Sequence, residues 1–301
     1  TQSRSSAASD VYKRQMRDGA YIDTTPIAET TVDDLVRQMV GRDVTELFPK
    51  QEAAIGEPLL QVTGLTRPGV FHDISFTVRA GEIVALAGLV GAGRSEVARA
   101  VFGVDPYSDG EVRMLGAGVA RRNPTAAMRS GLALVPEDRR KQGLVIDAGV
   151  GGNITLAIRR RLSKWGLITS GIENRAAREW ASRLEVKTHA LDTVAATLSG
   201  GNQQKVVLAK WLATDPRVLI IDEPTRGIDV GTKSEVHRLL SQLAGEGLGI
   251  LMISSELPEV LGMADRVLVM REGRITAEIS RDDATSENVM FAATHSSELQ
   301  S

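Results

Sequence analysis

The sequence contains no cysteine, only four histidines and no long apolar run. The absence of cysteine excludes disulfide bonds, thiol catalysis and cysteine-ligated zinc. With four scattered histidines, a metal site built from histidine clusters is not expected. No apolar segment approaches the roughly 18–20 residues that span a bilayer, and the first residues carry no apolar signal core. We therefore expect a cytosolic chain, which would reach a membrane, if it works at one, through a partner.

The chain also lacks a large excess of either positive or negative charge. The 301 residues carry a formal net charge of −2, and both signs are spread along the chain. A nucleic-acid binder usually shows a basic excess, so no nucleic-acid partner is expected. Hydrophobic residues make up 42% of the chain, which is enough to build a proper core in one large domain or two small ones.

Two segments resemble each other at a domain-sized offset. Residues 16–19 (Met-Arg-Asp-Gly) match residues 270–273 (Met-Arg-Glu-Gly), and the pattern continues downstream at the same offset. Such a period suggests a tandem duplication of which only the tail of the first copy is present; the alternative is a chance match. Residues 1–15 resemble a translated sequencing adapter, so we expect a disordered, non-native tail, the alternative being an ordinary disordered tail.

Short apolar runs alternate with helical patterns from residue 57 onward. The strand-like runs are 59–63, 74–78, 82–87, 132–135, 218–221 and 250–253, and helical patterns cover 173–184 and about 231–244. Asn123 and Pro124 open a further helix as its cap and first turn. Short apolar runs bounded by breakers are typical of parallel strands covered on both faces. The alternation with helices predicts an α/β domain with a parallel central sheet.

A glycine-rich loop follows the strand 82–87 and precedes a helix, which is the context of a phosphate-binding loop. Glycine lets backbone N–H groups turn toward phosphate oxygens, and the start of the helix favours an anion. Ser95 would place a hydroxyl on Mg²⁺. Position 94 carries Arg, with a wide planar guanidinium group, where the phosphate-loop pattern has Lys. The candidate ligands are Gly88, Gly91, Ala92, Gly93, Arg94 and Ser95. A plain turn between strand and helix is the alternative.

Two further motifs follow in order. Residues 198–205 precede an apolar helix, so that a hydroxyl, backbone N–H groups and a helix terminus could grip a γ-phosphate; the candidates are Ser199, Gly200, Gly201 and Gln203. The strand 218–221 ends in Asp222, which would hold Mg²⁺ through water, and Glu223, which would orient or deprotonate an attacking water. A helix cap and a core strand with a polar end are the alternatives for each segment taken alone.

Together these motifs resemble the ABC ATPases. The resemblance is to the second ATPase half of the tandem monosaccharide importers of the ribose, galactose, xylose and arabinose type, and it is carried by residues 91–95, 135–139, 199–205, 224–229 and 254–259. It implies an α/β P-loop NTPase fold with a parallel-sheet core, an antiparallel β subdomain and a helical signature subdomain. On this basis residues 16–56 are the end of a first ATPase domain with a linker, residues 57–296 the second domain, and 297–301 a tail.

The resemblance also implies a function. Two halves would bind ATP and Mg²⁺ between the phosphate loop of one half and the signature loop of the other, which corresponds here to residues 198–205. Asp229 would be a further nucleotide contact. Closure of the two halves would drive a membrane permease. The implied partners are the first half of the same protein, the permease and, indirectly, an extracytoplasmic sugar-binding protein. The chain would lie peripherally on the cytoplasmic face of the plasma membrane.

Other functions are open at this stage. The segment 138–156 is expected near the permease, and a plain surface loop is the alternative. A non-transport ABC ATPase usually has basic arms or long coiled-coil insertions, and neither occurs in this sequence. An unrelated P-loop kinase or GTPase has no use for a signature loop that grips a phosphate in trans.

Three positions depart from the ABC pattern. Arg94 replaces a lysine, Glu137 stands where a glutamine contacts Mg²⁺ and water, and Ser255 stands where a histidine senses the γ-phosphate. Glu137 adds negative charge beside a polyphosphate, and Ser255 lacks a donor that can carry charge. We therefore expect an asymmetric pair, in which this half hydrolyses ATP poorly and donates its intact signature loop to the first half. The intact Glu223 argues against weak catalysis.

Overall fold

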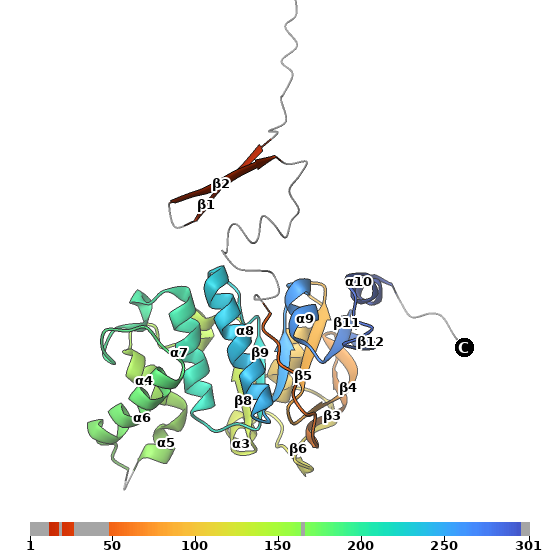
Figure 1. Cartoon of the computed structure of the whole chain (residues 1–301). Helices are drawn as coiled ribbons and strands as arrows, with labels where there is room; N and C mark the ends of the chain where they lie inside the picture. The colour runs from red at the N-terminus through yellow and green to blue at the C-terminus, as the bar shows by residue number, and fades with distance from the viewer. Residues whose placement is uncertain (1–11, 18–19, 27–47, 164–165, 296–301) are drawn as a thin grey trace, which may run out of the picture.

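A computed structural model describes residues 12–17, 20–26, 48–163 and 166–295 (Figure 1). The strands are β1 (Tyr12–Arg17), β2 (Ala20–Pro26), β3 (Pro58–Arg67), β4 (Phe71–Arg79), β5 (Ile83–Gly88), β6 (Asp109–Met114), β7 (Ala117–Gly118), β8 (Leu132–Val135), β9 (Val218–Asp222), β10 (Gly249–Ile253), β11 (Arg266–Arg271) and β12 (Arg274–Ser280). The α-helices are α2 (Arg94–Val101), α3 (Pro124–Arg129), α4 (Val150–Thr155), α5 (Arg159–Leu162), α6 (Ser170–Arg183), α7 (Gly200–Leu212), α8 (Val230–Gly245), α9 (Leu257–Met263) and α10 (Ser286–Thr294). Residues Arg139–Gly143 form a π-helical turn, and Leu156–Ile158 and Ala195–Thr197 form 3₁₀ turns.

A six-stranded sheet lies at the centre, in the order β12-β11-β5-β10-β9-β8. The strands from β11 to β8 pair in parallel, and β12 pairs antiparallel with β11 at one edge. Every residue of β8, β9 and β10 is buried, as apolar strands covered on both faces require. The predicted parallel central sheet is therefore confirmed.

Successive residues of the central strands contribute to two separate hydrophobic clusters. Ile83, Ala85 and Ala87 of β5 pack into the first cluster, and Val84 and Leu86 pack into the second. The first cluster includes residues of α4, α7, α8, α9 and α10, whereas the second includes residues of α2, α3 and the antiparallel sheet β4-β3-β6-β7. Because side chains alternate across a strand, one short apolar run stabilises both layers at once.

The remaining elements divide into an antiparallel part and a helical part. Helices α4, α5 and α6 gather at one end of the domain, away from β3, β4 and β12 at the other end (Figure 1). Helix α4 packs on α6 and on α7, the helix that begins within the signature motif (residues 198–205). The predicted architecture, a parallel core with an antiparallel β part and a helical part, is confirmed.

The parallel strands bring the predicted motifs to one edge of the sheet. Because these strands share a direction, the segments that follow their carboxyl ends meet at the same edge. The glycine-rich loop follows β5, Glu137 follows β8, Glu223 follows β9, and Ser255 follows β10. The predicted cap of α3 is also confirmed: the Asn123 side chain accepts a hydrogen bond from the Ala126 N–H at 3.0 Å.

The two segments of the internal repeat form hairpins of the same register. In β1–β2, Arg17 pairs with Ala20 and Tyr12 with Pro26, with an irregularity between residues 15 and 16. In β11–β12, Arg271 pairs with Arg274 and Arg266 with Ser280, with an irregularity between residues 269 and 270. Each of these positions in the first hairpin is separated from its counterpart in the second hairpin by the same number of residues as Met16 from Met270.

The first hairpin includes part of the segment that was expected to be a disordered tail. Residues 12–15 belong to β1 and pair antiparallel with β2. Residues 1–11 lie outside the described part of the chain, as do the residues that continue the repeat beyond β2.

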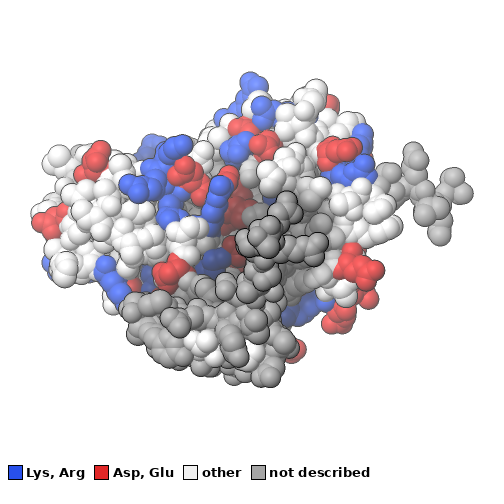
Figure 2. All heavy atoms as spheres, turned by 90° about the horizontal axis from the view of Figure 1, so that it is seen from above, with Lys and Arg blue, Asp and Glu red and all other residues white. Residues whose placement is uncertain are grey.

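The surface carries charges of both signs. On the face shown in Figure 2, acidic and basic side chains are interspersed, without a broad field of one sign. Within the described residues, no helix combines the length and the apolar character that crossing a membrane requires.

Candidate functional site

The glycine-rich loop between β5 and α2 has a backbone that only glycine adopts easily. Gly88, Gly91 and Gly93 have φ angles of 148°, 86° and 96°, in the region that disfavours a Cβ atom. Gly88 also lies against β11, where an added Cβ would stand 2.2 Å from the Met270 carbonyl oxygen. Ala92 is buried, and its carbonyl accepts the Gly273 N–H at 3.0 Å. The loop is thus locked to β11 while α2 begins directly after Gly93.

Ser95 and Asp222 lie together at the start of α2 and the end of β9. The Ser95 side chain hydrogen-bonds to the Asp222 carboxylate, and burial raises the pKa of Asp222 to about 6. Asp222 is 5% exposed, and its Oδ1 is buried without a hydrogen-bond partner in the described structure. A buried acceptor of this kind is costly unless something binds it. A hydroxyl and a carboxylate are oxygen ligands that Mg²⁺ prefers, so the pair fits a bound Mg²⁺.

Arg94 lies within this site and not at the surface. It is buried, and its Nη1 donates to the Ser254 carbonyl oxygen at 2.6 Å. Burial lowers the pKa of Arg94, while the charges of Glu223 and Asp222 raise it. Because guanidinium is charged at any ordinary pH, Arg94 partly balances these two carboxylates. Its attachment to the segment after β10 is not visible in the sequence.

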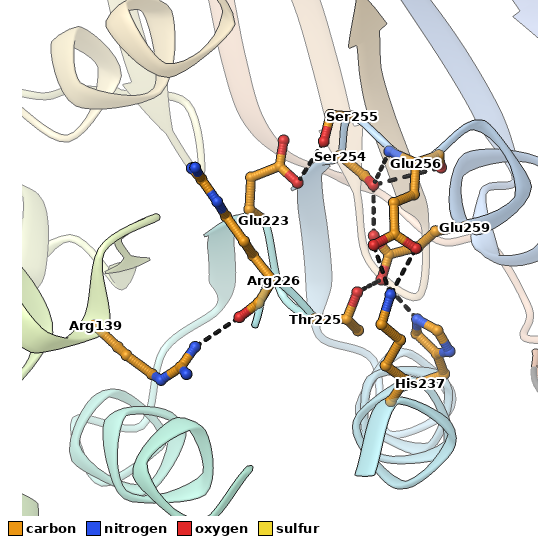
Figure 3. Close-up of polar contacts among 10 residues, drawn as sticks. Arg139, Glu223, Thr225, Arg226, His237, Ser254, Ser255, Glu256 and Glu259 are labelled. Carbon is orange, nitrogen blue, oxygen red and sulfur yellow. Dashed lines mark hydrogen bonds and ion pairs between the residues drawn. The ribbon is translucent and has the colours of Figure 1, made fainter. Parts of the chain in front are cut away.

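Glu223 and Ser255 contact each other across neighbouring strand ends (Figure 3). Ser255 Oγ donates to Glu223 Oε2 at 3.0 Å, and the Glu223 N–H donates to the Ile253 carbonyl at 2.8 Å. Glu223 has a φ of 50°, a strained value for a non-glycine residue. Burial raises the pKa of Glu223, and hydrogen bonds from Ser255 lower it. A carboxylate held in this way has the position and the basicity to orient a water.

Glu137 follows β8 and is paired with a residue that the sequence analysis missed. Its carboxylate forms an ion pair with Arg226, and both side chains are substantially exposed. The extra negative charge expected at this position is therefore offset by a neighbouring guanidinium. No sequence signal joins the two residues, because they lie on loops that only the sheet brings together.

The signature loop begins α7. Ser199 caps the helix: its Oγ accepts from the Asn202 N–H at 3.4 Å and from Asn202 Nδ2 at 2.9 Å. A Cβ on Gly200 would stand 2.8 Å from the Gly227 carbonyl, and a Cβ on Gly201 would stand 2.3 Å from the side chain of Thr232. Glycine is thus required here by close packing against the segment before α8 and against the first turn of α8.

The side chains of Gln203 and Asp229 both form hydrogen bonds within the chain. Gln203 is 3% exposed and its Nε2 donates to the Ala195 carbonyl at 3.1 Å. The side chain is therefore turned into the interior, against its expected place on the phosphate-binding surface, because the next turn of α7 faces the core. Asp229 caps α8 by accepting from the Thr232 N–H at 2.9 Å and Oγ1 at 2.7 Å, and these bonds lower its pKa.

Arg139 joins three segments of the site and was also missed by the sequence analysis. Its Nη1 and Nη2 donate to the carbonyl oxygens of Arg226 and Gly227 at 2.6 and 2.9 Å. The same guanidinium borders Gly200 of the signature loop. In the described residues, no hydrogen bond or ion pair joins the signature residues 199–203 to the phosphate-loop residues 88–95.

Comparison with known proteins agrees with this geometry. A family model described as ABC transporter matches residues 71–226. A ribose import ATP-binding protein of Streptomyces coelicolor is 65% identical over 279 residues, which cover 93% of this chain and 55% of that protein. A ribose import ATP-binding protein of Rhodococcus jostii is 60% identical over 281 residues, which cover 93% of this chain and 56% of that protein. The chain thus spans about half the length of the relatives it matches.

Solved structures show the same fold. A nucleotide-free ATP-binding cassette from an ABC transporter superposes with a TM-score of 0.67 at 21% identity, covering 79% of this chain and 99% of that chain. A dimeric ATP-binding cassette bound to ADP and Pi gives a TM-score of 0.63 at 19% identity, covering 74% of this chain and 99% of that chain. The matching family model, the ordered motifs and this fold together show that the chain belongs to the ABC transporter family, as an ATP-binding cassette.

Proposed function

We propose that this chain is the second nucleotide-binding half of a tandem ATPase that powers the import of a monosaccharide. The observation that carries the proposal is the convergence of the phosphate loop, Asp222, Glu223 and Ser255 at one edge of the sheet. The names of the relatives, which are ribose import ATP-binding proteins, favour sugar import over a non-transport ATPase.

The hairpin register supports the tandem arrangement. Two hairpins that share a sequence motif, a register and the position of an irregularity are what a duplication of the whole domain would leave. The first hairpin would then be the end of a first ATPase domain, and residues 27–56 would include the linker to the second. The length of the relatives, about twice that of the matched region, agrees with this arrangement.

The chain's own residues would act on ATP as follows. Backbone N–H groups of the phosphate loop and the N-terminus of α2 would bind the phosphates. Ser95 and Asp222 would hold Mg²⁺, which when bound neutralises charge on the phosphate oxygens. Glu223, oriented by Ser255, would hold an attacking water and accept its proton.

Asymmetry between the two halves is part of the proposal. Arg94 is attached to the Ser254 carbonyl, so it would have to leave this bond before it could follow a γ-phosphate. Ser255 is neutral, and a neutral hydroxyl stabilises a developing negative charge less than an imidazolium does. The signature loop has no such departure. The Ser199 hydroxyl accepts both bonds from Asn202, and its own proton can be donated to a phosphate of the first half.

The remaining partners follow from the same proposal. The segment 138–156 would contact a membrane permease, and Arg139 would connect that contact to the signature loop through Gly227 and Gly200. A sugar-binding protein outside the membrane would deliver the substrate to the permease, and the chain would lie peripherally on the cytoplasmic side.

Mixing the two halves tests the asymmetry. We expect this chain to bind ATP·Mg²⁺ with little turnover, and addition of the separately produced first half of the Streptomyces coelicolor relative to restore turnover. Ser199→Ala in this chain is then expected to lower the turnover of the mixture about 100-fold, because a transition-state donor is lost. Glu223→Gln is expected to change it less than about twofold.

The opposite pattern would refute the asymmetry. If Ser199→Ala leaves the mixture unchanged while Glu223→Gln abolishes turnover, the second half is the catalytic one. Efficient hydrolysis by this chain alone would show that Arg94, Glu137 and Ser255 are compatible with catalysis. Failure of the chain to bind ATP·Mg²⁺ at all would refute the proposed function itself.

A further inference from the structure

Glu259 is a buried carboxylate next to the site that the proposed chemistry does not use. It lies on α9, it is 1% exposed, and hydrogen bonds engage both carboxylate oxygens. Thr225 Oγ1 donates to Oε1 at 2.9 Å, and His237 Nε2 lies 2.6 Å from the same oxygen. Ser254 Oγ donates to Oε2 at 2.5 Å. A charge can be buried only when it is bonded in this way.

The three partners come from three different elements (Figure 3). Thr225 lies on the segment after β9, two residues beyond Glu223, and Ser254 begins the segment after β10. His237 lies on α8, which covers the same side of the sheet. Glu259 therefore connects the ends of two neighbouring parallel strands to the helices outside them. In the sequence these groups are too far apart to form a motif.

Ser254 links Glu259 to the candidate ATP site. Its side chain bonds Glu259, its carbonyl oxygen accepts the Arg94 guanidinium, and its neighbour Ser255 donates to Glu223. The Ser254 hydroxyl also accepts the Glu256 N–H at 3.0 Å, which closes the turn. A shift of this segment would move Arg94 and Ser255 together, and these are two of the three positions at which the chain departs from the family pattern.

Glu256, three residues before Glu259, has a different environment: it is exposed and pairs with Lys233 of α8 at 2.5 Å. The two carboxylates of one helical segment therefore provide a matched pair, one buried under the site and one on the surface.

We propose that Glu259 is a positioning residue for the ATP site, which fixes the Ser254–Ser255 segment against the Glu223 segment so that both face the γ-phosphate. The inference rests on the proposed function, because it takes ATP as the ligand of this loop. Within the described residues, the phosphate loop, which would bind the α- and β-phosphates, has no direct hydrogen bond or ion pair with Glu259, and only Arg94 near its end is linked to Glu259, through Ser254. The effect of Glu259 should therefore be larger on ATP than on ADP.

Comparison of ATP and ADP binding tests the inference. Calorimetric titration of this chain with ATP·Mg²⁺ and with ADP·Mg²⁺ gives the ratio of the two affinities. We expect Glu259→Gln to lower the preference for ATP over ADP about tenfold, the effect of one lost charge-assisted hydrogen bond. The amide keeps the shape of the side chain but presents an N–H₂ group to partners that are donors. Glu256→Gln should leave the ratio unchanged.

A second variant covers the case in which Glu259→Gln does not fold. Ser254→Ala keeps the buried carboxylate and removes one donor, so it should lower the same ratio to a smaller extent. An unchanged ratio in Ser254→Ala together with either an unfolded or a normally discriminating Glu259→Gln would overturn the inference and leave Glu259 a purely structural residue. Loss of ATP and ADP binding by the unsubstituted chain would instead refute the proposed function.

Discussion

Replacing Asp222 by Asn is expected to make the nucleotide-free chain more stable at neutral pH and, at the same time, to abolish its response to ATP·Mg²⁺. In the folded chain burial holds the pKa of Asp222 at about 6, against an ordinary value of 3.8. The folded state therefore binds this proton more tightly than the unfolded state does. Deprotonation above the ordinary pKa then favours unfolding.

The sign and the pH window follow from these two values. The penalty is nearly absent below pH 4, grows between pH 4 and pH 6, and is complete above pH 6. The shift corresponds to about 3 kcal/mol at pH 7 and to roughly half of that at pH 5. Asn has nearly the same shape and no charge, so Asp222→Asn should recover this free energy. For a domain of this size each kcal/mol shifts Tm by about 2–4 °C.

Thermal unfolding at pH 7 and pH 5, with and without ATP·Mg²⁺, checks the prediction. The unsubstituted chain should gain stability from the ligand by mass action, whereas the Asp222→Asn chain should not, because a ligand for Mg²⁺ is lost. Asp282→Asn is the control, since Asp282 is exposed and its substitution should alter neither quantity. If the Asp222→Asn chain proves less stable at pH 7, the carboxylate makes stabilising contacts that outweigh the free-energy cost of burying its charge.

Gly88→Ala is expected to destabilise the chain far more than Gly91→Ala, although both residues lie in the same loop with positive φ. An added Cβ at Gly88 would stand 2.2 Å from the Met270 carbonyl oxygen, whereas nothing lies within 4 Å of a Cβ at Gly91. Gly88 pairs with Met270 across β5 and β11, so relief of the clash must separate the two strands. Backbone strain alone costs about 1–3 kcal/mol, and the clash should bring the loss at Gly88 to about 4–5 kcal/mol.

Urea unfolding of the two variants separates strain from the clash. Gly91→Ala reports the cost of the left-handed backbone, and the difference between the variants reports the contact with β11. We also expect Gly88→Ala to lose ATP binding, because the loop would no longer be held against β11. Equal free energies of unfolding for the two variants would show that the β5–β11 contact yields easily and that this loop is less rigid than its geometry indicates.

Much of the fold was predictable because its signals are local. The apolar runs at 218–221 and 250–253 indicated buried parallel strands, and the cap at Asn123 indicated a helix start. The order of phosphate loop, signature loop and strand-end carboxylates also pointed to the family that the comparisons show. Each of these features depends on a few consecutive residues, whose backbone geometry is fixed by neighbours in the chain.

The residues that arrange the site were not predictable in this way. Nothing in the sequence indicated that Arg139 would bond the carbonyl of Gly227, or that Glu137 would pair with Arg226. Gln203 belongs to the signature motif, yet the packing of α7 turns it into the core. These contacts join loops whose relative position depends on the order of strands in the sheet.

By itself, the sequence determined the order of the elements, the motifs at the strand ends and the family, because hydrophobic periodicity and glycine positions act over short distances. Only the tertiary structure decided which groups surround those motifs: Arg94 on the Ser254 carbonyl, Ser255 on Glu223, and Glu259 beneath both strand ends. The physical reason is that a buried charge or carbonyl takes whichever partner the packed core brings within hydrogen-bond distance, and that partner is set by the topology of the sheet and not by distance along the chain.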